Sequence, residues 1–453
     1  MKTFKTTVVA LSIATMMSAA QWASAEMTAA EVDRLGKDLT PFGAEKAGNK
    51  DGTIPEWTGG MTAPPAGWKP EMGYIDPFAS EKPLFTITAA NMDQYKDKLT
   101  PGLMAMMKKY PDFVMPVYTS HRTYAASQKY YDDTKAFAAK VKLEGEQHLV
   151  NFDYSTFRPF PLPKTGAEAI TTHKNWNMGG GYTRCGDWLP TRASGEYYRV
   201  GFCEEVISGS NFDQKQPNNI FSFYGWYDAP ATLIGTIYLV RDPLDYGVVN
   251  RAAWIYNAGQ RRVRRAPDVA FDNQDDGTEG MRTSDDWWGF NGSLERYDWK
   301  LIGKKEMYIP YNAYKLNDSK LKYADMVAKG HLKSDLMRYE LHRVTIVEAT
   351  VKPGSSHVVA KRIFFMDEDS GLAALVDGYD TRGNLWRVYL EPHLQDYNAK
   401  VMFQSPYLVH DLSNGNFIAS MAMNERKAPV YKWGAQGKWA DFQIDAIRRK
   451  GSR

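Results

Sequence analysis

The second half of the chain shows a repeated pattern of short strands separated by turns. In residues 294–302, ring and aliphatic side chains alternate with charged ones, which is the two-residue period of a strand with one apolar and one wet face. Later connections are short, and Asn414-Gly415 is a strong hairpin signal. The further predicted strands are 337–351, 357–366, 371–379, 385–390, 401–410 and 417–423. Consecutive strands with tight turns form an antiparallel meander, which must curl or be covered to hide its apolar face.

Aromatic residues are abundant and are spread along the chain. The sequence contains 13 Trp, 27 Tyr and 20 Phe. Together with frequent Gly, Asn and Asp turns, these residues favour sheet over helix. We therefore predict a mainly β, α+β fold.

The first part of the chain has a different character. Residues 26–85 are rich in Pro and Gly and predict an irregular arm. A helix is predicted over 101–110, because Thr100 is a good N-cap and Pro101 suits the first helical position. A second helix is predicted over 123–142. From 147 onward strands dominate, with short helices near 166–174 and 319–329. The predicted organisation is an export signal, an arm with helices and a curved β region, at 1–25, 26–146 and 147–453.

The N-terminus has the features of a removable export signal. Lys2 and Lys5 precede a short apolar stretch at 8–17, and Ala23-Ser24-Ala25 before Glu26 is a small-residue cleavage site. The apolar stretch is shorter than the ~20 residues of a membrane span, and no later window supplies a transmembrane segment. We expect cleavage after Ala25 and a periplasmic location.

Charge gives no reason to bind nucleic acid. Lys2 and Lys5 are the only charged residues of the signal, so the mature chain keeps 54 of the 56 basic side chains against 53 acidic ones. This balance offers no electrostatic basis for binding nucleic acid or an anionic membrane.

Cys185 and Cys203 are the only cysteines. In an oxidising compartment they predict a disulfide, and the segments 184–191 and 197–207 can pair as a hairpin that brings them together. A reactive thiol or metal pair is the alternative, but it lacks a CxxC motif and a neighbouring histidine.

A search for catalytic motifs finds none, and we predict no catalytic residue, metal or cofactor. The histidines lack the spacing of zinc ligands, and there is no nucleophile elbow or phosphate-binding glycine loop. The acidic stretch 272–286 matches a calcium loop only in part, which leaves a solvated loop or a weak ion site. The basic run 261–265 is either a solvated or ion-paired face, or a surface for a phosphorylated lipid head group or an acidic partner.

Several long motifs resemble those of a proteobacterial family of unknown function that is often labelled outer-membrane lipoprotein-sorting protein. They are LTPFGAE at 39–45, GTIPEWTGG at 52–60, WIYNAGQRRVRRAP at 254–267, FNG at 290–292, and YDWKLIGKKEMYIPYN at 297–312. The resemblance covers essentially the whole mature chain. It implies a fold like the periplasmic carriers LolA and LolB, an open antiparallel half-barrel whose concave face is closed by helices. It also implies association with an inner-membrane exporter of the resistance-nodulation-division superfamily.

Such a half-barrel would expose a large apolar face, so a lid, an acyl chain or both must cover it. Burying an acyl chain contributes ~0.8 kcal/mol per methylene. We therefore predict a carrier or exporter accessory, not an enzyme, that binds a hydrophobic, acylated ligand such as a lipid or lipoprotein. The predicted ligand-binding wall is Leu233, Tyr238, Trp254, Tyr256, Tyr297, Trp299, Leu301 and Phe364.

Two other functions stay open at this point. A hydrolase or lyase acting on lipid or polysaccharide would need a His–carboxylate or Ser–His pair inside the cavity. A structural envelope protein would fill the cavity with its own side chains.

Overall fold

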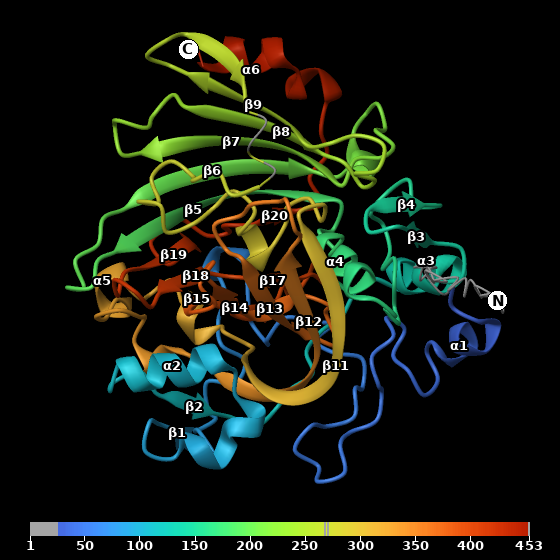
Figure 1. The fold of residues 1–453 in the computed structure, drawn as a ribbon, viewed down its shortest axis with the longest axis vertical. Helices are drawn as coiled ribbons and strands as arrows, with labels where there is room; N and C mark the ends of the chain where they lie inside the picture. Colours follow the sequence, from blue (N-terminus) through green and yellow to red (C-terminus); the bar gives the residue numbers. More distant parts are fainter. Residues whose placement is uncertain (1–25, 267–268, 270, 452–453) are drawn as a thin grey trace, which may run out of the picture.

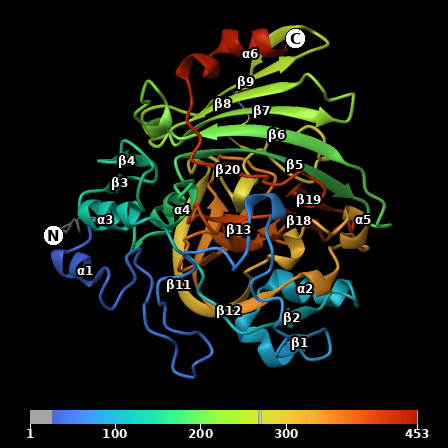
Figure 2. The same cartoon turned by 180° about the vertical axis from the view of Figure 1, so that it is seen from behind.

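The computed structural model describes residues 26–266, 269 and 271–451. The predicted export signal at 1–25, with its cleavage site, lies outside the described residues. One strongly curved sheet with a large apolar core organises the described chain (Figures 1 and 2).

The sheet is open and almost entirely antiparallel. Its strands follow in the order β1 (Phe85–Ile87), β2 (Met115–Val117), β12 (Tyr339–Val351), β13 (Lys361–Asp367), β14 (Ala373–Tyr379), β15 (Leu385–Leu390), β18 (Tyr407–Asp411), β19 (Phe417–Ala422), β5 (Gly181–Thr191), β6 (Val200–Ile207), β7 (Phe221–Ala229), β8 (Ile237–Asp242), β9 (Ala252–Asn257) and β10 (Arg262–Arg265). A single parallel bridge joins β2 to β12. Within the described chain the end strands β1 and β10 do not pair with each other. The predicted fold class, a mainly β, open antiparallel half-barrel, is confirmed.

Six strands lie off this main path: two pair with strands of the main sheet, and four form two separate two-stranded ladders. The long strand β11 (Tyr297–Pro310) pairs with β12, and the short β20 (Lys432–Trp433) pairs with β5. Two small ladders join β3 (Lys142–Glu144) to β4 (His148–Val150), and β16 (His393–Gln395) to β17 (Met402–Gln404).

The predicted strands occur in the predicted order, and two of them differ clearly from the prediction. The strand at 294–302 forms the first part of β11, which continues beyond a bulge between Leu301 and Gly303. The strand at 401–410 is wrong as a single element, because it divides into β17 and β18 at Pro406, whose nitrogen carries no hydrogen for a ladder. The hairpin at Asn414-Gly415 is confirmed, and Gly415 takes the positive φ of 80° that its turn requires.

The helices are short. The predicted helix after Thr100 is α2, and the Thr100 hydroxyl accepts the Leu103 N–H as its cap. The helix predicted at 166–174 is α4, whereas those predicted at 123–142 and 319–329 shrink to α3 and α5. The α-helices are α1 (Ala29–Arg34), α2 (Pro101–Lys109), α3 (Gln128–Phe137), α4 (Gly166–Lys174), α5 (Tyr323–Met326) and α6 (Ile444–Gly451). The described 3-10 turns are η1 (Pro70–Met72), η2 (Met92–Lys98), η3 (Gly209–Asn211), η5 (Trp287–Gly289), η6 (Lys315–Asn317), η7 (Ser334–Leu336) and η8 (Trp439–Phe442).

Neighbouring residues of β14 show what covers each face of the sheet. The carboxylate of Asp377 accepts the Gly102 N–H of α2 at 3.0 Å, whereas a Cβ on Gly289 of η5 would lie 3.7 Å from Val376. Since successive strand side chains point to opposite faces, α2 and η5 cover opposite faces. We call the η5 side the inner face. It is covered by α4, η5 and the irregular segment around them, so much of the cover is non-helical.

Candidate ligand-binding cavity

A cavity of about 390 Å³ lies between the inner face of strands β5–β9 and a segment that crosses over them. We call this segment the roof; it comprises the described residues from Phe271 to Asn291. Aromatic side chains make up a large part of the cavity wall, beside polar and charged ones. Its ring residues are Trp188, Phe202, Phe221, Phe223, Tyr227, Tyr238, Trp287 and Trp288. Its size and apolar lining are typical of small-molecule sites.

The strand register explains how distant residues form one wall. Glu204, Gly225, Tyr238 and Ile255 are directly opposed on β6, β7, β8 and β9. Directly opposed residues of an antiparallel sheet share a face, so this row lies on the inner face. Gly225 has no side chain because the rings of its neighbours already occupy that space: a Cβ would lie 2.4 Å from Phe223 and 2.6 Å from Phe202.

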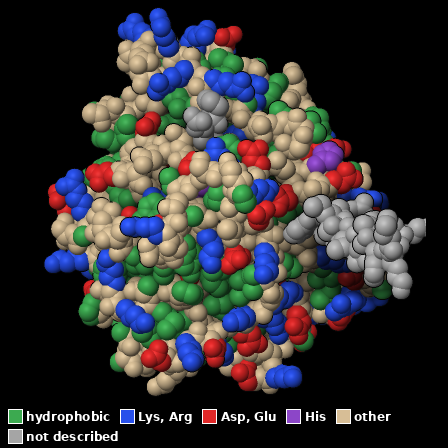
Figure 3. All heavy atoms as spheres, in the orientation of Figure 1, with side chains coloured by type: hydrophobic (Ala, Val, Ile, Leu, Met, Phe, Trp, Pro, Cys, Tyr) green, Lys and Arg blue, Asp and Glu red, His purple; other side chains and the backbone are tan. Residues whose placement is uncertain are grey.

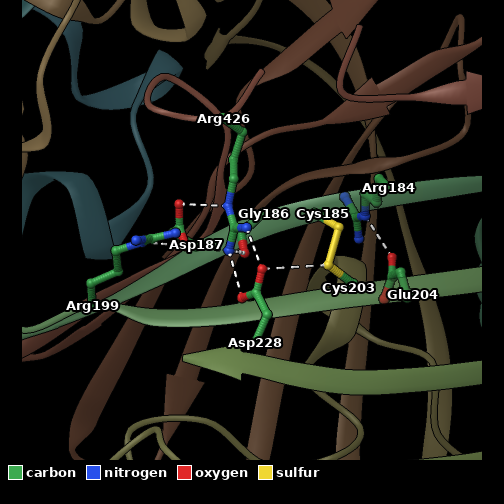
Figure 4. Close-up of a disulfide and its surroundings, with 9 residues drawn as sticks. All are labelled: Arg184, Cys185, Gly186, Asp187, Arg199, Cys203, Glu204, Asp228 and Arg426. Carbon is green, nitrogen blue, oxygen red and sulfur yellow. Dashed lines mark hydrogen bonds and ion pairs between the residues drawn. A yellow bond between two sulfur atoms is a disulfide. The ribbon is translucent and has the colours of Figure 1, made fainter. Parts of the chain in front are cut away.

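The disulfide joins the two strands at the centre of this wall. Cys185 and Cys203 are opposed on β5 and β6 and are bonded, as predicted (Figure 4). The next opposed pair along the two strands is Arg184 and Glu204. The side chains of this pair point to the cavity side of the sheet. Both side chains are buried, and Arg184 Nε lies 2.5 Å from Glu204 Oε1. The covalent bond therefore holds in register the two strands that carry this pair, of which Glu204 lines the cavity.

Ion pairs fasten the roof to the sheet. Arg362 of β13 lies within 3.3 Å of Asp285 and 3.0 Å of Asp286, and all three side chains are buried. Burial raises the pKa of Asp285, but Arg362 and His357 outweigh it and hold this pKa below its ordinary value. Arg387 of β15 also contacts Asp286, at 3.4 Å. Removing one partner of such a buried pair is strongly destabilising.

The remaining acidic side chains of 272–286 also have partners. Asp275 pairs with Arg282 at 2.8 Å, whose guanidinium lies between the rings of Trp188 and Trp287, at 4.4 and 4.1 Å from their centroids. The other contacts are Asp272 with Arg296, Glu279 with Arg192, and Asp276 with the Tyr238 hydroxyl at 2.6 Å. The acidic stretch is thus an ion-paired roof instead of a solvated loop.

Of the eight predicted wall residues, Tyr238 lines this cavity. Burial raises the pKa of its hydroxyl, and it donates to the Asp276 carboxylate. Leu233 lies beside the roof, with its Cδ1 3.1 Å from where a Cβ on Gly277 would be.

Trp254 and Tyr256 lie on the outer face under the C-terminal segment. Arg241 stacks between Trp254 and Trp439, 5.2 and 4.6 Å from their centroids. Tyr256 is buried against α6, where a Cβ on Gly451 would lie 2.2 Å from its ring.

Tyr297, Trp299 and Phe364 form a separate aromatic cluster with Phe290. Trp299 is only 3% exposed, and its centroid lies 5.3, 5.6 and 5.8 Å from those of Phe290, Tyr297 and Phe364. Its indole N–H donates to the Leu294 carbonyl at 2.9 Å. Leu301 is half-buried and packs against the same core.

The aromatic residues of β7 were not included in the predicted wall, although their sequence carried a usable signal. Phe221, Phe223, Gly225 and Tyr227 occupy every second position, and the three rings line the cavity. That two-residue period was sufficient to assign them to one face.

One histidine–carboxylate cluster lies outside this cavity. A ring nitrogen of His342 and carboxylate oxygens of Asp367 and Asp369 lie within 4.8 Å of one another. However, Arg122 donates to both oxygens of Asp369, at 2.9 and 2.6 Å, and also to backbone carbonyls of the N-terminal arm. These contacts identify the cluster as an anchor of the arm.

Comparison with known proteins places the chain in a family. Residues 86–448 match the family described as Protein of unknown function (DUF1329). The chain belongs to this family. An uncharacterized protein of Pseudomonas aeruginosa, PA3922, is 45% identical over 436 residues, which cover 95% of each chain. The family predicted from the motifs is confirmed.

Three solved structures show weaker similarity, each covering 62% of this chain. They are a candidate outer membrane lipoprotein-sorting protein domain from Vibrio parahaemolyticus (13% identity, TM-score 0.43, 97% of that chain), a DUF1329 family protein from Desulfovibrio piger (16%, 0.41, 97%) and a LolA superfamily protein from Nitrosomonas europaea (10%, 0.38, 98%). Among the described residues, no helix of this chain has the length and apolarity to span a membrane.

Proposed function

We propose that the protein is a periplasmic, non-catalytic carrier that holds a hydrophobic, acylated ligand in the cavity under the roof. The observation that carries this proposal is the cavity itself: about 390 Å³ bounded by aromatic side chains, which the protein's own residues leave unfilled. An acyl chain would bury its methylenes against these rings, at ~0.8 kcal/mol each.

The polar groups around the cavity support binding over catalysis. The buried carboxylate of Glu204 is paired with Arg184, and the partly buried carboxylate of Asp275 is paired with Arg282. The described residues that line the cavity include no histidine. His357 and Asp285, which lie 2.9 Å apart and could resemble a hydrolase pair, are both buried and do not line the cavity. Asp285 also pairs with Arg362, so this contact helps to hold the roof on the sheet.

A periplasmic location is supported by the predicted export signal and by the Cys185–Cys203 disulfide. The proposed partner, an inner-membrane exporter of the resistance-nodulation-division superfamily, rests on the family resemblance. It would load or unload the ligand.

Blocking the cavity tests the proposal. Ile255 lies on the inner face and lines the cavity, so Ile255→Trp should fill part of it. The matched control is Ile234→Trp, because Ile234 is 53% exposed and does not line the cavity. The protein would be purified from periplasm, and its bound lipid would be measured by native mass spectrometry and organic extraction.

We expect the parent and Ile234→Trp to retain an acylated molecule and Ile255→Trp to lose it. The neutral dye N-phenyl-naphthylamine should follow the same order in a fluorescence titration. A parent protein that carries no acylated molecule and does not bind the dye would contradict the proposal.

A further inference from the structure

The cavity opens towards the edge strand β10, which carries several basic side chains. Arg264 and Arg265 both line the cavity, although their side chains are largely exposed to solvent. Arg264 is opposed to Ile255 of β9, so it extends the inner-face row through Tyr238 and Ile255 to the end of the sheet. The row therefore changes from apolar to cationic at the mouth of the cavity.

These arginines differ from the other arginines around the cavity. Arg184, Arg251 and Arg282 each pair with a carboxylate, namely Glu204, Asp242 and Asp275. In contrast, no carboxylate oxygen of the described chain lies within 4.0 Å of a nitrogen of Arg264 or Arg265. The carboxylate of Asp276, which also lies at the mouth, accepts a hydrogen bond from the Tyr238 hydroxyl.

The surrounding surface is also basic. Arg261 and Arg262 lie on the same edge of the sheet, and both side chains are exposed. Figure 3 shows Lys and Arg side chains gathered at this end of the molecule, above the middle of the sheet. Because the whole chain has a formal charge of only +3, the positive charge of this edge of the sheet is a local feature.

We infer that the ligand is an anionic amphiphile: its chain enters the aromatic cavity, and Arg264 holds its acidic head group, with Arg265 beside it. This inference rests on the proposed function and adds the chemistry of the head group. A guanidinium suits both carboxylate and phosphate, since it can donate two parallel hydrogen bonds to either. The ligand could therefore be a free fatty acid or an acidic phospholipid, which share this chemistry.

The test compares an acid with its uncharged analogue. The fluorescent fatty acid cis-parinaric acid and its methyl ester would be titrated into the parent, Arg264→Gln and Arg449→Gln. The last variant is the matched control, because it removes the same charge from the outer side of the sheet, where α6 lies.

We expect the parent to bind the acid more tightly than the ester, and Arg264→Gln to weaken binding of the acid by about 10-fold or more. Binding of the ester should change little, and Arg449→Gln should behave like the parent. Transfer of labelled phosphatidylglycerol or phosphatidylcholine from vesicles separates the two sources: preference for phosphatidylglycerol indicates a phospholipid, and binding of the free acid alone indicates a fatty acid.

Two results would overturn the inference. If the parent binds the ester as tightly as the acid, or if Arg264→Gln affects both equally, Arg264 does not recognise an acidic group, although the cavity still binds acyl chains. If neither compound nor the neutral dye binds, the proposed function itself fails and this inference fails with it.

Discussion

Trp299→Ala tests whether the aromatic cluster under β11 is packed core or part of the ligand wall. The side chain is 3% exposed and contacts the rings of Phe290, Tyr297 and Phe364. Truncating a buried aromatic side chain to alanine costs about 3–5 kcal/mol, and loss of the hydrogen bond to the Leu294 carbonyl adds about 1 kcal/mol. We therefore expect a loss of about 4–6 kcal/mol, a large part of the total stability of a typical domain.

The measurement is urea unfolding followed by circular dichroism, with the dye titration performed on the folded variant. Trp439→Ala serves as a control, since Trp439 is a half-buried tryptophan at the outer face and its loss should cost clearly less. Dye affinity should be unchanged in folded Trp299→Ala, because Trp299 does not line the cavity. A stability loss below about 1 kcal/mol, combined with weaker dye binding, would refute this reasoning and return Trp299 to the ligand wall.

Three further predictions concern other parts of the chain. Burial raises the pKa of Asp377 from 3.8 to about 7, so the native state keeps a proton that the unfolded chain loses, and the free energy of unfolding should fall by up to about 4 kcal/mol as the pH rises from 4 to 7. Asp377→Asn should remove this fall when urea unfolding is measured at several pH values. An unchanged pH dependence in the variant would contradict the prediction. Thiol titration of the denatured, unreduced protein should find no free cysteine, whereas two reactive thiols would show that the bond is absent. Replacing both Cys185 and Cys203 with alanine should lower the free energy of unfolding by about 3 kcal/mol for a loop of this length. N-terminal sequencing of periplasmic protein should begin at Glu26, and a retained Met1 would contradict export by a cleaved signal.

The sequence by itself determined much of the local structure. Two-residue periods, turn residues and caps identified β11, the Asn414-Gly415 hairpin and α2, because these features depend on neighbours a few residues away. The Cys185–Cys203 bond followed from the hairpin around it, and long motifs were sufficient to identify the family.

Only the tertiary structure decided which face of each strand meets the cavity. Alternation places Trp254 and Tyr256 on one face of β9 and Ile255 on the other, but it cannot say which face is inner. That choice depends on α6, which covers the first two residues, and on the roof, which covers the third. The acidic stretch shows the same limit: Asp286 finds Arg362 and Arg387 at sequence separations of 76 and 101. Such partners meet only when the sheet curls, so their pairing is a property of the folded chain and leaves no local pattern in the sequence.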